Sequence, residues 1–376
     1  MDKLNVAVLF GGISTEHEVS IISGVQVLNA LDKNKYNVLP IYITKTGQWI
    51  KGDESFFKVE TYKNLKKLED KKKFDVDSLF HDSASFLKFS KDEKIDVIFP
   101  VFHGRNGEDG SIQGLFEMAN LAYVGCGVTA SAIGMDKMLS KRIAQAINIP
   151  VLPGNWVNES NRNIAMDGLK FPVYVKPVHL GSSIAVTCAK NNKELDEALE
   201  VAFFYDDKVL VEQGLVDAKE TNISLLGNDP YEISPTEMPV STSDILSFKD
   251  KYLSDGSKSR GMASLKRVIP SPIKKDVERK IQEYAVKFFS EIGGGGIVRM
   301  DFLLTRDEKK IYLNEINTIP GSLAFYLWKE KGITFSKLLD KLVDLAIDRR
   351  KKKEKLNTIF ESNILEGFNG AKGTKN

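Results

Sequence analysis

The segment 301–321 reads Asp301-Phe-Leu-Leu-Thr305-Arg-Asp-Glu-Lys-Lys310-Ile311-Tyr-Leu-Asn-Glu315-Ile-Asn317-Thr-Ile-Pro-Gly321. Two short apolar runs flank a charged turn, and this pattern predicts a β-hairpin. Because side chains alternate along a strand, Glu315 and Asn317 share one face, and the facing strand can bring Asp301 to it. Three hard oxygen ligands on a hairpin predict a magnesium site that also holds phosphate oxygens.

These acids have a simpler interpretation as well. They could pair with Arg299 or with nearby lysines on a solvated face, since clustered acids often belong to structural ion pairs. For a single carboxylate that interpretation is the better one. The combination of all three side chains with the Pro320-Gly321 turn favours the metal.

Composition places the chain among ordinary globular proteins. Its 376 residues suffice for two or three domains with a buried core, and 42% of them are apolar. The 53 basic and 51 acidic residues leave a net charge of +2, which gives no argument for a nucleic-acid partner. Two cysteines argue against a disulfide framework and fit a reducing compartment. Because the sequence shows no bilayer-spanning apolar run and no signal-peptide pattern, we expect a cytoplasmic protein without a membrane partner.

Strand and helix patterns alternate along the first part of the chain. Short buried strands are expected at 6–10, 38–43 and 95–102, with an amphipathic helix at 16–31 after the first. This order predicts a parallel sheet with both faces covered, in an α/β fold. The lysine-rich stretch 51–94 has weak periodicity, so we interpret it as a peripheral excursion.

The rest of the chain divides into two further units. Strands at 173–177 and 208–213 with a helix at 193–204 indicate the second unit, and a helix at 335–347 ends the third. The predicted domains are an N-terminal substrate-binding domain (1–134), a central one (135–216), a C-terminal one (217–348) and a basic, ragged tail (349–376).

Two loops follow strands of the first unit and should lie at the same edge of its sheet. One contains Glu18, and the other is the glycine-rich run from His103 to Gly114. Ligands of open α/β sheets bind beyond the carboxyl ends of the strands, so Glu18 and His103 could share a cleft. A carboxylate there suits a substrate ammonium group. Taken alone, Glu18 is better interpreted as a first-turn acid favoured by the helix dipole, and His103 as a satisfied loop histidine.

A third loop offers a phosphate site. Lys176 ends a strand and is followed by the turn Gly181-Ser182-Ser183. A lysine beside such a turn can hold phosphate through its charge and through backbone N–H groups, although an ordinary surface lysine fits this segment about as well. The spacing is not that of a Walker A loop, and no Gly-x-Gly-x-x-Gly follows a strand.

The stretch 241–261 is polar and bounded by glycine, with few apolar anchors. This composition fits a mobile lid, and it also fits an exposed loop with no function. Lys251 and Tyr252 lie within it.

Taken together, these motifs resemble the D-alanine–D-alanine ligases of the ATP-grasp group. The similarity extends in order from about residue 4 to residue 348. The matching motifs are His103-Gly-x-x-Gly-Glu-Asp-Gly-x-x-Gln-Gly, Lys176-Pro with Gly181-Ser-Ser, Lys251-Tyr252-Leu-Ser-Asp, Arg299-x-Asp301 and Asn314-Glu-Ile-Asn-Thr-x-Pro-Gly321. The resemblance implies an ATP-grasp fold of three α/β domains with an N-terminal Rossmann-like parallel sheet. It also implies a homodimer.

The resemblance implies ATP between the central and C-terminal domains, with two magnesium ions for which manganese is an alternative. The implied metal ligands are Asp301, Glu315 and Asn317. The implied nucleotide contacts are Lys137, Lys176 and Lys251 together with Asn317, the hinge residues Glu212, Gln213, Gly214 and Leu215, and Glu220 for the ribose.

For the substrates, the resemblance implies that Glu18 meets the ammonium of the first D-alanine. A hydrogen-bonded group of Glu18, Ser182 and Tyr252 would close the lid, and Arg299 with the Gly321 N–H would hold an oxyanion. His103 and Ser322 complete the expected substrate contacts. The implied reaction is ATP-dependent joining of two D-alanines through an acylphosphate, as in peptidoglycan precursor synthesis.

The sequence departs from the family pattern after Gly321. Tyr326 stands where a serine usually helps to hold the carboxylate of the second substrate, and Ser322 could substitute for it. Gln213 stands where a hinge lysine is common, and Ala185 where glycine is usual. Two alternatives therefore stay open: a related ligase with a different second amino or hydroxy acid, and a nucleotide-binding protein without catalysis.

Overall fold

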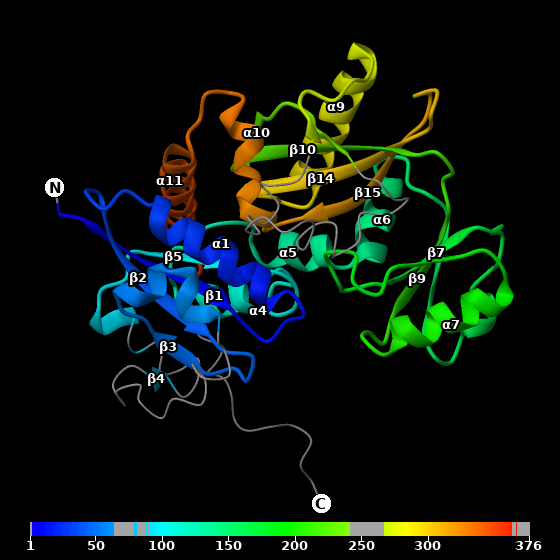
Figure 1. Ribbon diagram of the computed structural model, residues 1–376. Helices are drawn as coiled ribbons and strands as arrows, with labels where there is room; N and C mark the ends of the chain where they lie inside the picture. Colours follow the sequence, from blue (N-terminus) through cyan, green and yellow to red (C-terminus); the bar gives the residue numbers. More distant parts are fainter. Residues whose placement is uncertain are drawn as a thin grey trace, which may run out of the picture.

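The computed structural model describes residues 2–63, 79–80, 88, 90–240, 267–362 and 366. Three main sheets form the molecule, and Figure 1 shows the first at lower left, the third at the centre and the second at right. Within the described residues, the structure contains no helix that is both long and apolar enough to cross a membrane.

The first sheet has the strand order β4-β3-β2-β1-β5. Its strands are β1 (Leu4–Gly11), β2 (Tyr36–Ile43), β3 (Trp49–Lys51), β4 (Leu79–Phe80) and β5 (Val97–Val101). The central strand β1 pairs in parallel with both β2 and β5, as the sequence predicted. The edge strands β3 and β4 are antiparallel.

Alternation along β1 explains how this sheet is covered. Val6, Val8 and Phe10 point into a core shared with helix α1 (His17–Ala30). Ala7 and Leu9 point to the opposite core, which contains helix α4 (Ser111–Met118). Both faces are therefore buried, and this is the reason that β1 is apolar at every one of these positions.

The second sheet is smaller and entirely antiparallel. Its order is β6 (Gly154–Val157), β9 (Val209–Gln213), β7 (Val173–Pro177) and β8 (Thr187–Ala189). Helix α7 (Asn192–Phe203) packs on it, and the side chain of Asn191 caps that helix by accepting from the N–H of Glu194. The two predicted strands and the helix of this unit are confirmed within a residue or two.

The third sheet holds the hairpin. Its order is β11 (Glu232–Ile233), β10 (Lys219–Gly227), β14 (Gly296–Leu304) and β15 (Ile311–Asn317). Its core includes α9 (Lys275–Glu291), and it also takes side chains from α5 (Val128–Met135) and α6 (Lys137–Ala146). Smaller elements are β12 (Met238–Pro239), β13 (Arg267–Val268), η1 (Glu54–Phe57), η2 (Val59–Tyr62) and η4 (Arg162–Ile164).

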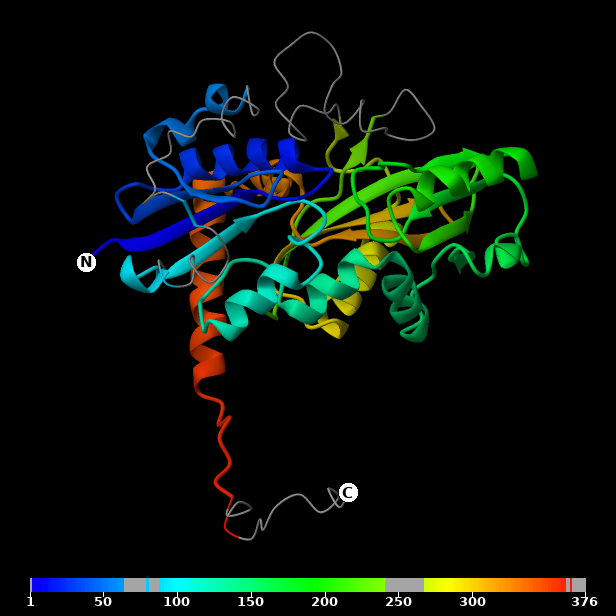
Figure 2. The same ribbon diagram turned by 90° about the horizontal axis from the view of Figure 1, so that it is seen from below.

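The chain ends in a helix that returns to the first sheet. After η6 (Gly321–Ala324) and α10 (Phe325–Lys329), α11 (Phe335–Glu354) places Leu338, Leu342 and Val343 in the core beneath β1 and α1. Arg349 donates from Nη2 to the carbonyl oxygen of Tyr123 at 2.6 Å. The predicted helix 335–347 is thus seven residues too short, and Figure 2 shows the end of α11 projecting from the body.

Each of the three predicted domains contains one main sheet, and the domain boundaries stay a proposal. The hydrophobic cores do not follow them, because α6 belongs to the core of the third sheet and α11 to that of the first. Of the excursion 51–94, the structure describes residues 51–63, which include η1 and η2, the short strand β4, and residues 88 and 90–94. Residues 241–266, which include the predicted lid, lie outside the described residues.

Candidate active site

The hairpin of β14 and β15 brings the expected metal ligands together. Asp301 pairs with Glu315 across the ladder, and Arg299 pairs with Asn317. A register shift directly after Asp301 marks a β-bulge, a device that re-aims side chains. The Asn317 amide donates to Asp301 Oδ2 at 3.2 Å. The predicted hairpin and the shared face are therefore confirmed.

Arg299 forms a two-pronged ion pair with Asp301. Its Nε and Nη2 each donate to one carboxylate oxygen at 2.7 Å. Although burial alone would lower the pKa of Arg299, the neighbouring Asp301 carboxylate raises it, so the guanidinium stays charged. The simpler interpretation of Asp301 as an ion-pair partner is thus correct in part. The pair is buried, however, and does not lie on a solvated face.

A polar pocket opens in front of this pair. It lies where loops after β1, β5, β7 and β15 meet, so residues from all three predicted domains contribute. Its lining consists of Glu16, His103, Glu108, Gly181, Ser182, Arg299, Glu315, Asn317, Ile319 and Gly321. Nine of these ten are charged, polar or glycine, which indicates a site for a charged ligand.

Glu16 is the acid that reaches into this pocket. It is 5% exposed, and the Ser182 hydroxyl donates to its Oε1. Gly181 lies so close that a Cβ added there would stand 2.8 Å from Glu16 Oε2. A larger residue at 181 would therefore displace the Glu16 carboxylate from this position. Ser182 itself adopts a left-handed backbone with φ +54°, which turns the loop towards Glu16.

Glu18 lies elsewhere. Its side chain is 55% exposed and pairs with Lys45 at 2.5 Å. The reason is local, because α1 begins at His17 and Glu18 is already part of its first turn. Glu16 precedes the helix and follows the loop into the pocket instead.

His103 supports the pocket wall from behind. Its Nε2 lies 2.9 Å from the hydroxyl of Ser23, which also accepts from the N–H of Ser322 at 3.3 Å. Burial lowers the pKa of His103 to about 4, so the imidazole is neutral at pH 7. This neutral ring therefore links α1 to the turn after Pro320 and adds no charge to the pocket.

Glu108 joins the first and third sheets at the pocket floor. Its Oε2 accepts from the N–H of Gly104 and its Oε1 from the N–H of Ile319, both at 2.9 Å. Burial, and then the nearby Glu16 carboxylate, raises the pKa of Glu108 to about 8. Three acids, Glu16, Glu108 and Glu315, thus line one small pocket, and a bound cation would reduce the electrostatic repulsion between them.

A buried acid organises two lysines beside the hairpin. Glu212 on β9 is fully buried, and one of its oxygens lies 2.6 Å from the ammonium of Lys176. Its other oxygen contacts the ammonium of Lys141 on α6. Lys176 is also 3.3 Å from the side-chain oxygen of Asn314, so it is held between β9 and β15.

Lys137 approaches from the start of α6. Its ammonium donates to the carbonyl oxygens of Val178 and Leu180, the first at 3.3 Å. Burial lowers the pKa of Lys137. Both lysines expected to meet phosphate are therefore fixed next to the loop that carries Gly181 and Ser182.

The expected adenine hinge lies at the end of β9. The side chain of Gln213 exchanges hydrogen bonds with the backbone of Lys170, 3.0 Å from its N–H and 2.8 Å from its carbonyl oxygen. The N–H of Gly214 donates to Pro172, and Leu215 follows. Glu220 is the second residue of β10, and its Oε1 accepts from the side-chain amide of Asn222 at 3.2 Å.

The segment after Pro320 turns with unusual handedness. Ser322, Leu323 and Ala324 all have φ near +50°, a conformation that costs L-residues roughly 1–2 kcal/mol each. The turn points the N–H of Ser322 at Ser23 and leaves Gly321 in the pocket wall. A strained turn of this kind is held by its surroundings and often marks a functional site.

Comparison with known families decides the identity of this arrangement. The model for the N-terminal part of D-ala D-ala ligases matches residues 5–126, and the model for their C-terminal part matches residues 139–344. The chain belongs to the D-alanine–D-alanine ligase family.

Individual relatives agree over nearly the full length. The D-alanine–D-alanine ligase of Thermosipho africanus is 40% identical over 381 aligned positions, covering 96% of this chain and 98% of the relative. The solved ligase of Coxiella burnetii has a TM-score of 0.75 at 29% identity, covering 94% and 97%. VanG D-Ala:D-Ser ligase of Enterococcus faecalis has a TM-score of 0.74 at 31% identity, covering 92% and 100%. The expected ATP-grasp fold is thereby confirmed.

One assignment carried over from the D-alanine–D-alanine ligase family needs correction. Glu18 was expected to contact Ser182, but Ser182 donates to Glu16. Both acids flank His17, so the loop offers two candidates that the motif alone does not separate. Burial and the contact with Ser182 select Glu16.

Sequence reasoning also missed Glu108 and Lys141 in this ligase. Glu108 belongs to the glycine-rich motif after His103, and its place within that motif was the available signal. Lys141 had none, because it appears as one more polar residue of an amphipathic helix. Lys251 and Tyr252, expected in the lid, lie outside the described residues.

Tyr326 stands at the position where the family resemblance led us to expect a serine. It contacts Glu237 and Arg267. Its hydroxyl donates to Glu237 at 3.0 Å, and the guanidinium of Arg267 stacks 3.5 Å from the centre of its ring. Burial raises the pKa of Tyr326, so the phenol stays protonated. Ser322 is buried in the neighbouring turn and is not part of the pocket lining.

Proposed function

We propose that this protein joins two D-alanines to D-alanyl-D-alanine, using ATP and passing through an acylphosphate. Family membership supports the ligase reaction and the use of ATP. The single observation that carries the proposal is the pocket in which Glu16, Arg299 and Glu315 converge beside Lys137 and Lys176. No dinucleotide or Walker A loop competes with this assignment.

The nucleotide phosphates are proposed to lie between the two lysines and the hairpin. Lys137 and Lys176 supply positive charge there, held by carbonyl oxygens and by Glu212. The donor set of Asp301, Glu315 and Asn317 fits magnesium or manganese, since all three offer hard oxygens from one sheet face. When bound, such ions neutralise the phosphate oxygens that the attacking carboxylate must approach.

The first D-alanine is proposed to bind with its ammonium against Glu16. The side-chain carboxylate of Glu16 is closely surrounded by Gly104, Gly181 and Ser182. Placement of the ammonium there directs the substrate carboxylate towards the hairpin and the phosphates. His103, being neutral and bound to Ser23, holds this wall in place and does not compete for the ammonium.

The tetrahedral oxyanion of the second step is proposed to lie between Arg299 and the N–H of Gly321. Both line the pocket, and Arg299 is fixed by Asp301. Preorganised donors of this kind lower the barrier most when water is excluded. A homodimer, a cytoplasmic location and a role in peptidoglycan precursor synthesis follow from the family resemblance and stay predictions.

A second candidate function concerns the acceptor. VanG, one of the structural neighbours, is a D-Ala:D-Ser ligase, and Tyr326 replaces the usual serine in this chain. A different small amino acid, or a hydroxy acid, is therefore the main alternative. A protein that only binds nucleotide is disfavoured, because Arg299, Asp301, Glu315 and Asn317 are paired across one hairpin and Lys176 lies 3.3 Å from Asn314 on its second strand.

One assay separates these functions. Phosphate release and product mass are measured with ATP, magnesium and D-alanine, first alone and then with D-serine or D-lactate as acceptor. D-alanyl-D-alanine as main product supports the proposal. A mixed product with D-serine or D-lactate supports the second candidate. Absence of phosphate release with every amino acid leaves only nucleotide binding.

A further inference from the structure

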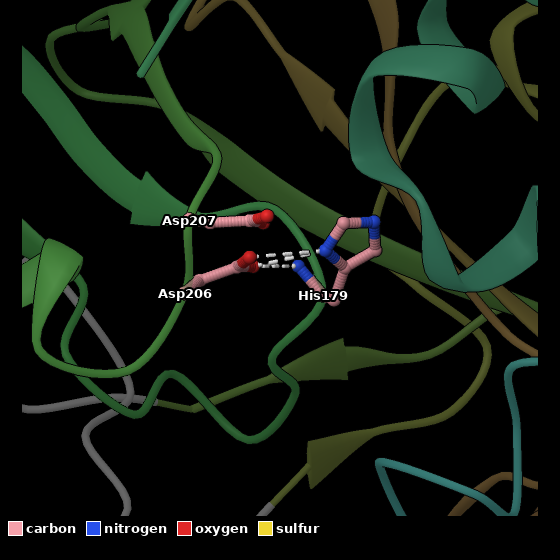
Figure 3. Close-up of side chains that lie close together, drawn as sticks. All are labelled: His179, Asp206 and Asp207. Atoms are coloured by element: carbon pink, nitrogen blue, oxygen red, sulfur yellow. Dashed lines mark hydrogen bonds and ion pairs between the residues drawn. The ribbon is translucent and has the colours of Figure 1, made fainter. Parts of the chain in front are cut away.

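His179 lies outside the pocket and connects three segments: the loop after β7, the segment before β9 and the start of α6. His179 follows β7 and precedes the loop with Gly181 and Ser182. Its Nδ1 lies 3.1 Å from Asp206, whose carboxylate also accepts from the His179 backbone N–H at 2.6 Å. Its Nε2 lies 3.3 Å from Asp136. Figure 3 shows the ring directed at Asp206, with Asp207 beside it.

The partner Asp136 is tied to the start of α6. Its Oδ1 accepts from the N–H groups of Met138 and Leu139, both at 2.9 Å, and so caps the helix. Lys137 is the next residue, and its ammonium donates to the carbonyl oxygens on either side of His179. The helix start and the loop are therefore joined twice, once by Lys137 and once by His179.

The contacts of the His179 ring with Asp136 and Asp206 indicate its protonation state. A neutral imidazole has one N–H donor, whereas the imidazolium has two. Both ring nitrogens of His179 face carboxylate oxygens, so only the charged ring can donate to both. His179, Asp206 and Asp207 lie close enough together to suggest a metal site. A ring that donates from both nitrogens, however, offers no lone pair to a metal, which argues against that interpretation.

We propose that charged His179 is a positioning residue, which locks the loop 178–183 onto the start of α6 so that the Lys137 ammonium is held at the ATP phosphates. This inference rests on the proposed role of Lys137. In this proposal His179 does not contact the substrate. It acts through the carbonyl groups of Val178 and Leu180, which accept hydrogen bonds from the Lys137 ammonium.

The charges around the ring agree with this role. The hydrogen bond to Asp136, and then that to Asp206, raises the pKa of His179 to about 9. The titratable groups that face it are Asp136 and Lys137 from the start of α6, and Asp206 and Asp207 from the segment before β9. Their summed charge is negative, which favours the imidazolium at pH 7.

A double-mutant cycle tests the coupling. His179→Gln keeps one hydrogen bond without charge, and we expect it to raise the KM for ATP about tenfold. In the Lys137→Ala background, the same change should alter the KM for ATP by less than about twofold, because the lysine that it positions is gone. Two independent, multiplying effects would overturn the proposal, as would a His179→Gln variant with unchanged KM for ATP.

A pH profile separates positioning from a purely structural role. In the unmodified protein, the KM for ATP should rise above about pH 9 as His179 loses its proton. His179→Arg keeps its charge, so this rise should disappear and the KM at pH 7 should stay near normal. A rise that persists in His179→Arg would belong to Lys137 and would contradict the inference.

Two controls identify which hypothesis fails. Melting temperatures of the variants show whether each one folds. If Lys137→Ala binds ATP normally, the proposed phosphate site is wrong, and the inference falls with it. If Lys137→Ala binds ATP weakly while His179→Gln is normal, the phosphate site stands and only the role of His179 is wrong.

Discussion

At the scale of single residues, Glu16 and Glu18 lie in different environments because helix α1 begins between them, at His17. Glu16 and Glu18 are two positions apart, yet Glu16 is buried at the polar pocket and Glu18 pairs with Lys45 at the surface. The same contrast holds between Arg299, buried against Asp301, and Arg306, exposed at the tip of that hairpin. Such pairs provide matched variants.

Glu16→Gln should strongly weaken binding of the first D-alanine, whereas Glu18→Gln should leave ligation near normal. The first change removes the charge proposed to hold the D-alanine ammonium, and charged hydrogen bonds are worth about 1.5–3 kcal/mol each. We expect the KM for the first D-alanine to rise at least about tenfold. Steady-state kinetics with varied D-alanine measure it. A larger loss in Glu18→Gln would restore the original assignment.

Arg299→Ala should stop peptide formation while ATP still binds. The variant removes an oxyanion donor, a loss worth about 10²- to 10³-fold in kcat. It also leaves Asp301 buried without its partner, which should lower the free energy of unfolding by about 3–5 kcal/mol.

Arg306→Ala in the same hairpin is the control for Arg299. Its side chain is 82% exposed, so stability should change by less than about 0.5 kcal/mol. Product formation and urea denaturation are measured on both variants. Near-normal turnover in Arg299→Ala would refute its role.

At the scale of elements, loops and helix starts carry the chemistry while strands hold them in register. The β14 and β15 ladder fixes Arg299, Asp301, Glu315 and Asn317 on one sheet. The loop 178–183 is the more delicate element, because it depends on close approach and on left-handed residues. It should therefore tolerate less change than the strands on either side of it.

Gly181→Ala should fold normally and lose activity. An added Cβ would stand 2.8 Å from Glu16 Oε2, and the flexible glutamate can move away at small cost to stability. That movement displaces the proposed ammonium site, so we expect the KM for D-alanine to rise.

Gly114→Ala on α4 is the matched control for Gly181. A Cβ there meets no atom within 4 Å, and alanine should stabilise the helix by up to about 1 kcal/mol. Melting temperature and kinetics of the two variants are compared. Normal D-alanine kinetics in Gly181→Ala would argue against the role of Glu16.

At the scale of the whole molecule, the two ends of the described chain share one core. Helix α11 packs against α1 and the first sheet, so the predicted C-terminal domain completes the N-terminal one. Arg349 adds hydrogen bonds to the backbone at Tyr123 and Gly125. The pocket lies where these parts meet, and its geometry depends on their mutual packing.

Leu342→Ala should therefore destabilise the protein strongly although it lies outside the pocket. Leu342 is 1% exposed in the core beneath β1, and such truncations cost about 2–5 kcal/mol. Lys352→Ala, on the exposed end of the same helix, should cost less than about 0.5 kcal/mol. Urea denaturation midpoints decide this. Equal effects would mean that α11 does not contribute to the core.

The sequence by itself determined the elements and the chemistry of the hairpin. Short apolar runs placed β1, β7 and β9, and the alternation of side chains along β15 placed Glu315 and Asn317 on one face, because both patterns are written directly into neighbouring residues. The motif 301–321 likewise placed Asp301, Glu315 and Asn317 on one face before any contact was known.

Only the tertiary structure decided which residues meet across the chain. It selected Glu16 over Glu18, placed Glu108 and Lys141 at the site, and packed α11 on the first sheet. The physical reason is that burial and charge pairing arise from surfaces brought together by folding. Residues far apart in sequence acquire these properties from one another, and local pattern carries no record of them.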